Sequence, residues 1–224
     1  MRSTICLLAL LLMTGCAPSQ PRRNLDILES PSSSYSDRLH AIEYFQKKGG
    51  PQYVEDLIRV MKNQLELHGE VAIALGRQGG PLALEYLEQQ WEILETQSES
   101  GDKDEREEAL NRMPAVAAGL SLLGNDQHVD VIFTLLESEN EGIGSFAAYA
   151  GQFIRTPQMR LALYKTLLSD KFNFAVARCS AAYSLYAMRD PELKAVLEIL
   201  LAGQEETHEC FDDLQEELRN PKGR

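Results

Sequence analysis

A glycine turn that ends one helix and starts the next sets the organisation of this chain. Ala72 to Gly76 are small or apolar, and Gly79-Gly80-Pro81 follows them closely. Glycine tolerates the left-handed conformation that ends a helix, and proline suits a first helical turn because its missing N–H would be unpaired there anyway. Gly49-Gly50-Pro51 repeats the same three residues thirty positions earlier. We therefore take Pro51 and Pro81 as equivalent points of an internal repeat.

Three further positions, Asp126, Pro157 and Pro191, continue the series, with successive spacings of 30, 45, 31 and 34 residues. Large apolar residues stand six and ten positions after these points: Leu57, Leu87, Ile132, Leu163 and Leu197, then Met61, Trp91, Leu136, Leu167 and Leu201. Mostly small residues stand nine positions before them: Ile42, Ala72, Ala117, Ala148 and Ala182. The pattern predicts units in which a helix with small residues is followed by an outgoing helix with bulky core residues, stacked as an all-α solenoid.

Two stretches carry a family resemblance. Arg178 to Leu185 is similar to the Arg-x-x-Ala-Ala-x-Ala-Leu pattern of HEAT-like repeats, and Ala72 to Gly76 resembles its Ala-x-Ala-Leu-Gly ending. The resemblance covers roughly residues 35 to 203 and implies a right-handed α-solenoid of about five helix-pair repeats. Phycobilin lyases are similar at the level of the repeat alone, which implies no bilin chemistry. A tetratricopeptide array is the alternative, although its Trp-x-x-Leu-Gly-x-x-Tyr pattern is missing.

The N-terminus has the pattern of an export signal. A short positive start precedes an apolar run from Ile5 to Met13 that is too short to span a bilayer as a mature helix. Leu12 to Cys16 resembles the bacterial lipobox, which implies a signal peptide over residues 1–15 and lipidation (palmitate) of Cys16. Acyl chains would then hold the protein to a membrane. The alternative is an ordinary secretory signal that leaves Cys16 as a free thiol. In diderm lipoproteins, a residue such as Ala17 after the cysteine implies a periplasm-facing place on the outer membrane.

The mature chain divides into three further parts. Residues 16–34 are rich in proline and serine, and we expect them to be the lipidated cysteine and a flexible tether. Residues 35–203 form the repeat domain, interrupted by an acidic insertion at 97–112 that either borders a binding surface or is only a solvated loop. We expect Pro114 to open the helix after that insertion. Residues 204–224 form an acidic capping helix and tail, with an apolar stripe at Phe211, Leu214 and Leu218.

The charge of the chain limits its partners. The formal net charge is −12 at pH 7. Nucleic acids and anionic lipid surfaces demand basic faces, so neither is an expected partner beyond the N-terminal lipid itself. The partner that remains is another protein or complex of the cell envelope.

Two cysteines of the repeat domain and cap, Cys179 and Cys210, are candidates for a disulfide. An exported protein meets an oxidising compartment, which favours the bond, and it would join the last inward helix to the capping helix. The alternative is two buried thiols whose Cα atoms lie too far apart.

The sequence contains no pattern typical of a catalytic or metal-binding site. Its histidines, His40, His68, His128 and His208, stand at unrelated positions and form no ligand spacing. Repeat enzymes that resemble deoxyhypusine hydroxylase hold iron with several His-Glu dyads, whereas only His208-Glu209 matches here. We therefore expect no catalytic residue, no metal and no cofactor.

Aromatic residues and arginines gather in the last two units. The aromatic residues are Phe146, Tyr149, Phe153, Tyr164, Phe172, Phe174, Tyr183 and Tyr186, and the arginines are Arg155, Arg160, Arg178 and Arg189. Both kinds are favoured at protein interfaces, so we expect the arginines to line a partner-binding groove, although internal packing would explain each residue singly. The sequence thus predicts a non-enzymatic envelope scaffold or assembly factor. The alternatives are a ligand- or metal-binding repeat protein with a catalytic role, and a mechanical spacer.

Overall fold

The computed structural model describes residues 19–169, 176–202 and 209–219, and within them the protein is entirely helical. The α-helices are α2 (Gln20–Glu29), α3 (Tyr35–Lys48), α4 (Val54–Asn63), α5 (His68–Gln78), α6 (Pro81–Ser98), α7 (Lys103–Leu122), α8 (Val129–Leu136), α9 (Glu141–Gly151), α10 (Pro157–Leu167), α11 (Val176–Ala187), α12 (Leu193–Leu201) and α13 (Glu209–Arg219). Two short 3-10 helices, η1 (Pro51–Tyr53) and η2 (Leu65–Leu67), lead into α4 and α5.

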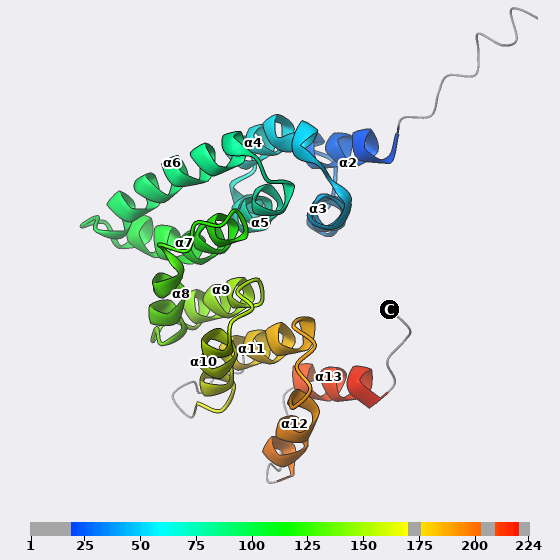
Figure 1. Ribbon diagram of the computed structural model, residues 1–224, viewed down its shortest axis with the longest axis vertical. Coiled ribbons are helices and arrows are strands. Elements are labelled where there is room, and N and C mark those ends of the chain that lie inside the picture. The colour runs from blue at the N-terminus through cyan, green and yellow to red at the C-terminus, as the bar shows by residue number, and fades with distance from the viewer. Residues whose placement is uncertain (1–18, 170–175, 203–208, 220–224) are drawn as a thin grey trace, which may run out of the picture.

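The helices form a curved, two-layered arc (Figure 1). Helices α3, α5, α7, α9 and α11 pack against one another in succession and form the inner layer. Helices α2, α4, α6, α8 and α10 cover them from outside, each against the inner helix that follows it. The open side of the arc lies between α3 at one end and α11 and α13 at the other. Packing between successive neighbours is compatible with a helical repeat.

The glycine turns stand between packed pairs of helices rather than inside them. Helices α5 and α6 lie on either side of Gly79-Gly80-Pro81 and make few contacts with each other. Helix α4 packs closely against α5, and α6 packs closely against α7. The predicted units are therefore offset by one helix. Gly79 and Gly80 have positive φ angles of 78° and 93°, as expected for this turn. Gly49 and Gly50 differ, since both have negative φ angles and the extended conformation.

The predicted core positions are confirmed. All five residues six positions after the repeat points are fully buried: Leu57, Leu87, Ile132, Leu163 and Leu197. Of the residues ten positions after, four are buried and Leu201 is half-buried. The residues nine positions before the repeat points, most of them small, are buried as well. Their small side chains let one inner helix pack closely against the next.

The predicted tether is wrong for residues 20–29, which form helix α2. Leu25 and Leu28 are buried against the rest of the protein, and Glu29 forms a 2.7 Å ion pair with Arg59 of α4. Pro21 stands in the first turn, where a proline favours a helix. Helix α2 therefore covers the exposed side of α3 and caps the N-terminal end of the arc.

We expect Leu28→Ala to lower the free energy of unfolding by about 2 kcal/mol, the low end for a buried leucine because α2 has neighbours on only one side. Urea denaturation followed by circular dichroism measures the effect. Arg23→Ala on the exposed side of α2 is the control and should change stability by less than about 0.5 kcal/mol. Equal stability of the two variants would mean that residues 20–29 behave as a tether after all.

The acidic stretch 97–112 is mostly helical rather than a loop. Helix α6 continues to Ser98, and α7 begins at Lys103, well before Pro114. The start of α7 is fixed by Asp102, whose side chain accepts hydrogen bonds from the backbone amides of Asp104 and Glu105. Acidic residues in this first turn also suit the positive end of the helix dipole. Pro114 is buried inside α7, so the prediction that it opens a helix is wrong.

Helix α13 packs against α11 and α12 at the other end of the arc. Phe211 and Leu214 of the predicted stripe are buried, and Leu218 is half-buried. The helix therefore covers the last inner helix, as a terminal cap does. None of the helices in the described part of the chain is both long and apolar enough to cross a membrane.

Candidate interaction groove

The inner layer encloses a groove of about 1130 Å³, open to solvent along the concave side of the arc. Its lining comes from α3 and α5 on one side and from α9, α11 and α13 on the other. Segments from both ends of the chain thus meet at one surface, because the arc curves back on itself (Figure 1).

Helices α3 and α5 give the groove a polar wall in which Glu43 and Glu70 are balanced by Lys47 and Arg77. Glu43 forms a 2.5 Å ion pair with Lys47 one turn further along α3. Gln46 donates a 3.1 Å hydrogen bond to the backbone carbonyl of Glu70, which ties α3 to α5. The side chain of Glu70 is half-buried, and this burial raises the pKa of its carboxyl above the usual range.

Aromatic side chains from α9 form the facing wall. Tyr149 of α9 and Phe153 just after it line the groove, whereas Phe146, at the same helical spacing, is not among the lining residues. The Arg77 guanidinium of α5 lies 5.6 Å from the centre of the Phe153 ring, so α5 and α9 meet across the groove. Burial, helped by the nearby Glu70 carboxylate, raises the pKa of Tyr149 to about 12, while an interaction with Gln46 opposes the rise.

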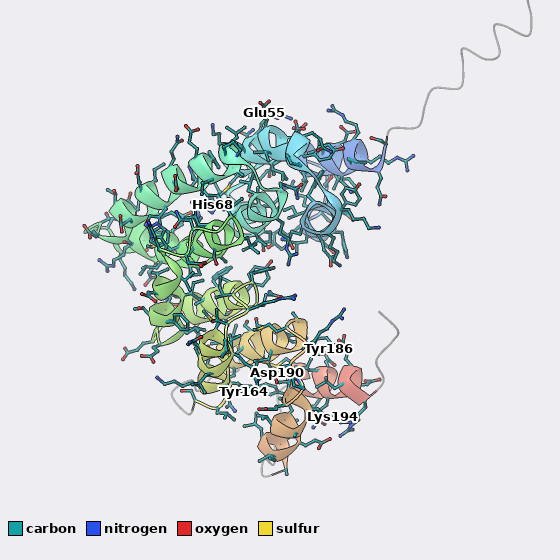
Figure 2. The ribbon with its side chains drawn as sticks, viewed as in Figure 1. Glu55, His68, Tyr164, Tyr186, Asp190 and Lys194 are labelled. Atoms are coloured by element: carbon teal, nitrogen blue, oxygen red, sulfur yellow. A yellow bond between two sulfur atoms is a disulfide. The ribbon has the colours of Figure 1, made fainter. Side chains whose placement is uncertain are left out.

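Helix α11 and the turn after it complete the lining. Tyr186 and Arg189 face the groove, and Figure 2 places Tyr186 at the end of α11 that borders the opening. Arg189 is exposed and has a positive φ of 59°, uncommon for a residue other than glycine. It is the only one of the four predicted arginines among the residues that line this groove.

The other predicted arginines lie elsewhere. Arg155 is exposed in the connection after α9. Arg178 donates a 2.9 Å hydrogen bond to the backbone carbonyl of Leu167 and lies 5.8 Å from the centre of the Phe211 ring. It therefore joins α10, α11 and α13 within the protein, and its binding to a partner stays a prediction.

Arg160 belongs to a second internal network, built around Asp190. Its guanidinium forms ion pairs with Asp190 at 2.6 Å and with Glu192 at 2.8 Å. Asp190 also accepts hydrogen bonds from the Tyr164 hydroxyl at 2.6 Å and from the Glu192 amide at 2.9 Å. Burial and this bond to Asp190 raise the pKa of Tyr164. Arg160 and Tyr164 thus fix the turn between α11 and α12 (Figure 2).

The structure brings Cys179 and Cys210 together in a disulfide, with their Cα atoms 6.2 Å apart. The bond ties α11 to α13 across a sequence separation of 31 residues. A closed loop of that size contributes about 3 kcal/mol in the chain-entropy account. Cys16, Phe172, Phe174 and His208 lie outside the described residues.

Several groove residues carry no signal in the sequence. Gln46, Glu70 and Arg77 stand in helices where polar residues usually face solvent, and only the curvature of the arc brings them opposite α9. Within the described residues, no group of three or more His, Cys, Asp or Glu side chains is placed to hold a metal ion.

One histidine is buried away from the groove. His68 lies among α5, α6 and α7 (Figure 2), and its Nε2 is 3.5 Å from Gln90 Oε1. Only 4% of its surface is exposed, and its Nδ1 has no hydrogen-bond partner in the described structure. Burial, together with the positive charge of Arg112, lowers the pKa of His68 to about 4.

This depressed pKa makes stability depend on pH. In the unfolded chain His68 binds a proton near pH 6.5, whereas in the folded protein it binds one only near pH 4. Stability should therefore fall as the pH drops through this window. Between pH 7 and pH 5 the expected loss from His68 is about 2 kcal/mol. Urea unfolding of His68→Gln at both pH values measures it, with exposed His40→Gln as control. If the His68→Gln variant loses as much stability between pH 7 and pH 5 as the wild type does, His68 is not the source of the pH dependence.

Comparison with known proteins adds no argument about function. No protein-family model matches the chain, and no curated protein is similar to it in sequence. Among solved structures, it resembles an engineered protein from a structural genomics consortium, at 18% identity over 89% of this chain and 94% of that one, with a TM-score of 0.38. A second engineered protein from the same consortium is 22% identical over 97% of this chain and 57% of that one, with a TM-score of 0.39. Scores this low support neither a shared fold nor a shared task.

Proposed function

We propose that this protein is a lipid-anchored, non-enzymatic interaction module of a bacterial cell envelope, and that its inner groove holds a partner protein. The observation that carries the proposal is the groove itself, where five helices from both ends of the chain present aromatic and charged side chains together. Aromatic and arginine residues are the usual anchors of protein interfaces. A scaffold or assembly factor needs such a surface and no catalytic group.

The proposed fold is a right-handed solenoid of HEAT-like helix pairs. The successive packing of α3, α5, α7, α9 and α11 supports stacked units, and the caps α2 and α13 suit the two ends of such a stack. Each unit pairs an outer helix with the inner helix that follows it, so among the described helices α2 and α3 form the first of five such pairs and α10 and α11 the last.

The proposed anchor is the lipidated Cys16. Helix α2 begins at Gln20, so the chain between them spans at most about 14 Å even when fully extended. The anchored arc would therefore stand close to the bilayer, with its α2 end nearest. Cys16→Ser should move the protein from the membrane fraction to the soluble fraction. Retention of this variant on membranes would argue for another means of attachment.

The test of the groove compares two exposed basic residues. Arg189 lines the groove, and Lys194 stands on α12 and is not among the lining residues. Affinity purification from solubilised membranes should recover a specific envelope protein with the wild type and with Lys194→Asp, but not with Arg189→Asp. Equal recovery with both variants would place the partner elsewhere. A metal or small molecule that copurifies in stoichiometric amount would favour the ligand-binding alternative.

A further inference from the structure

Glu70 differs from the other carboxylates near it because no cation accompanies it. Glu43 is paired with Lys47, and Glu66 forms a 2.6 Å ion pair with Arg38. Within the described residues, no basic side chain lies at ion-pair distance from the Glu70 carboxylate, and its own backbone amide only partly offsets the effect of burial on its pKa. A half-buried carboxylate without a cation is costly, because burial removes water that would otherwise stabilise the charge.

The surroundings of Glu70 are polar and aromatic. Burial and the Glu70 carboxylate together raise the pKa of two phenols, Tyr149 of α9 and Tyr35 of α3. The Gln46 side chain ends beside the Glu70 backbone. A carboxylate that lacks a paired cation and has phenols in its surroundings is favourable for a cationic group.

Arg77 provides a charge of the opposite sign further along the same groove. It stands seven residues after Glu70 on α5, which corresponds to about 10.5 Å along the helix. It is exposed, its ring contact is with Phe153, and no carboxylate of the described residues pairs with it. The groove thus offers a negative site and a positive site, the latter against the Phe153 ring.

We propose that Glu70 binds an arginine or lysine side chain of the partner protein, within an extended segment whose acidic residue about three positions away pairs with Arg77. The inference rests on the proposed function and specifies the chemistry of the partner. In the extended polyproline II conformation three residues make one turn and rise about 9 Å, so both side chains project from the same side at nearly the separation of the two sites. The groove volume exceeds that of most small-molecule pockets, so a peptide segment fits it better than a metabolite does.

The test uses selection of random twelve-residue peptides displayed on phage against the detergent-solubilised full chain. Peptides enriched on the wild type should carry a basic and an acidic residue three positions apart. Selection on Glu70→Lys should replace the basic residue by an acidic one, and selection on Glu70→Gln should remove the preference without reversing it. Glu55→Lys, the same charge change on the outer edge of the arc (Figure 2), should select the wild-type pattern.

Binding of one enriched peptide gives the quantitative check. Fluorescence anisotropy should show affinity at least tenfold weaker for Glu70→Lys and unchanged for Glu55→Lys. A peptide whose basic residue is replaced by glutamate should bind the Glu70→Lys protein more tightly than it binds the wild-type protein. Persistence of the basic residue in peptides selected on Glu70→Lys, or no enrichment on the wild type, would overturn the inference. If Arg189→Asp still abolishes capture of an envelope partner, the role of Glu70 fails while the proposed function stands.

Discussion

Replacing Gly76 by alanine is expected to destabilise the protein by about 3 kcal/mol, since the backbones of α5 and α7 touch at this point. A Cβ at residue 76 would lie 2.5 Å from the carbonyl oxygen of Gly119 and 2.7 Å from its Cα. A Cβ at Gly119 would in turn lie 2.6 Å from the Ala72 carbonyl oxygen. Because backbone atoms form the obstacle, the two helices must separate to admit even a methyl group.

Gly69→Ala in the same helix is the matched control. Its Cβ would lie 3.4 Å from the Ala115 Cβ, an ordinary contact, so the higher helix propensity of alanine should stabilise the protein by about 0.5 kcal/mol. Thermal unfolding by circular dichroism should therefore show a Tm lowered by roughly 6–12 °C for Gly76→Ala and unchanged or raised for Gly69→Ala. Equal Tm values would contradict the close contact of α5 and α7.

Asp190→Ala is expected to cost about 3 kcal/mol, because the substitution removes the acceptor that three donors share. The Asp190 side chain is 2% exposed, and its loss leaves the Tyr164 hydroxyl and the Glu192 amide without their partner. Arg160 is 37% exposed and can turn to solvent, so its share of the cost is small.

Glu192→Ala provides the comparison, since Glu192 pairs with the same arginine from an exposed position. We expect it to cost less than about 0.5 kcal/mol. Urea denaturation of both variants, and of each combined with Tyr164→Phe, measures the coupling. A cost for Asp190→Ala that does not diminish when Tyr164 is already phenylalanine would show that their hydrogen bond contributes little.

Turn residues and apolar spacing predicted much of the helical order. Helix α3 begins at Tyr35, where the repeat domain was expected to begin, and the five bulky residues six positions after the repeat points are all buried. These features are local, because a Gly-Pro turn and a periodic apolar stripe need no knowledge of distant residues. The failures at α2 and α7 also have local causes. Prolines and serines around Leu25 and Leu28 hid a short amphipathic helix, and the capping signal of Asp102 outweighed the proline at 114.

The residues of the groove could not be predicted from the sequence pattern. Arg160 and Arg178 were chosen because they stand near aromatic residues in the chain, yet both serve internal contacts with partners some distance away in sequence. Glu70 and Arg77 were missed because α5 reads as a core helix, and their opposition to Tyr149 and Phe153 follows from the curvature of the whole arc. Curvature is set by small packing differences between successive helices, which residue periodicity does not record.

The central claim is that the inner groove holds a protein partner at the membrane. The most direct measurement places a photo-activated crosslinking amino acid at Tyr186, which lines the groove, or at exposed Lys194 on α12 (Figure 2), in living cells. The account predicts one abundant envelope protein crosslinked from position 186 and not from position 194. Crosslinking of the same protein from both positions, or of none from position 186, would contradict it.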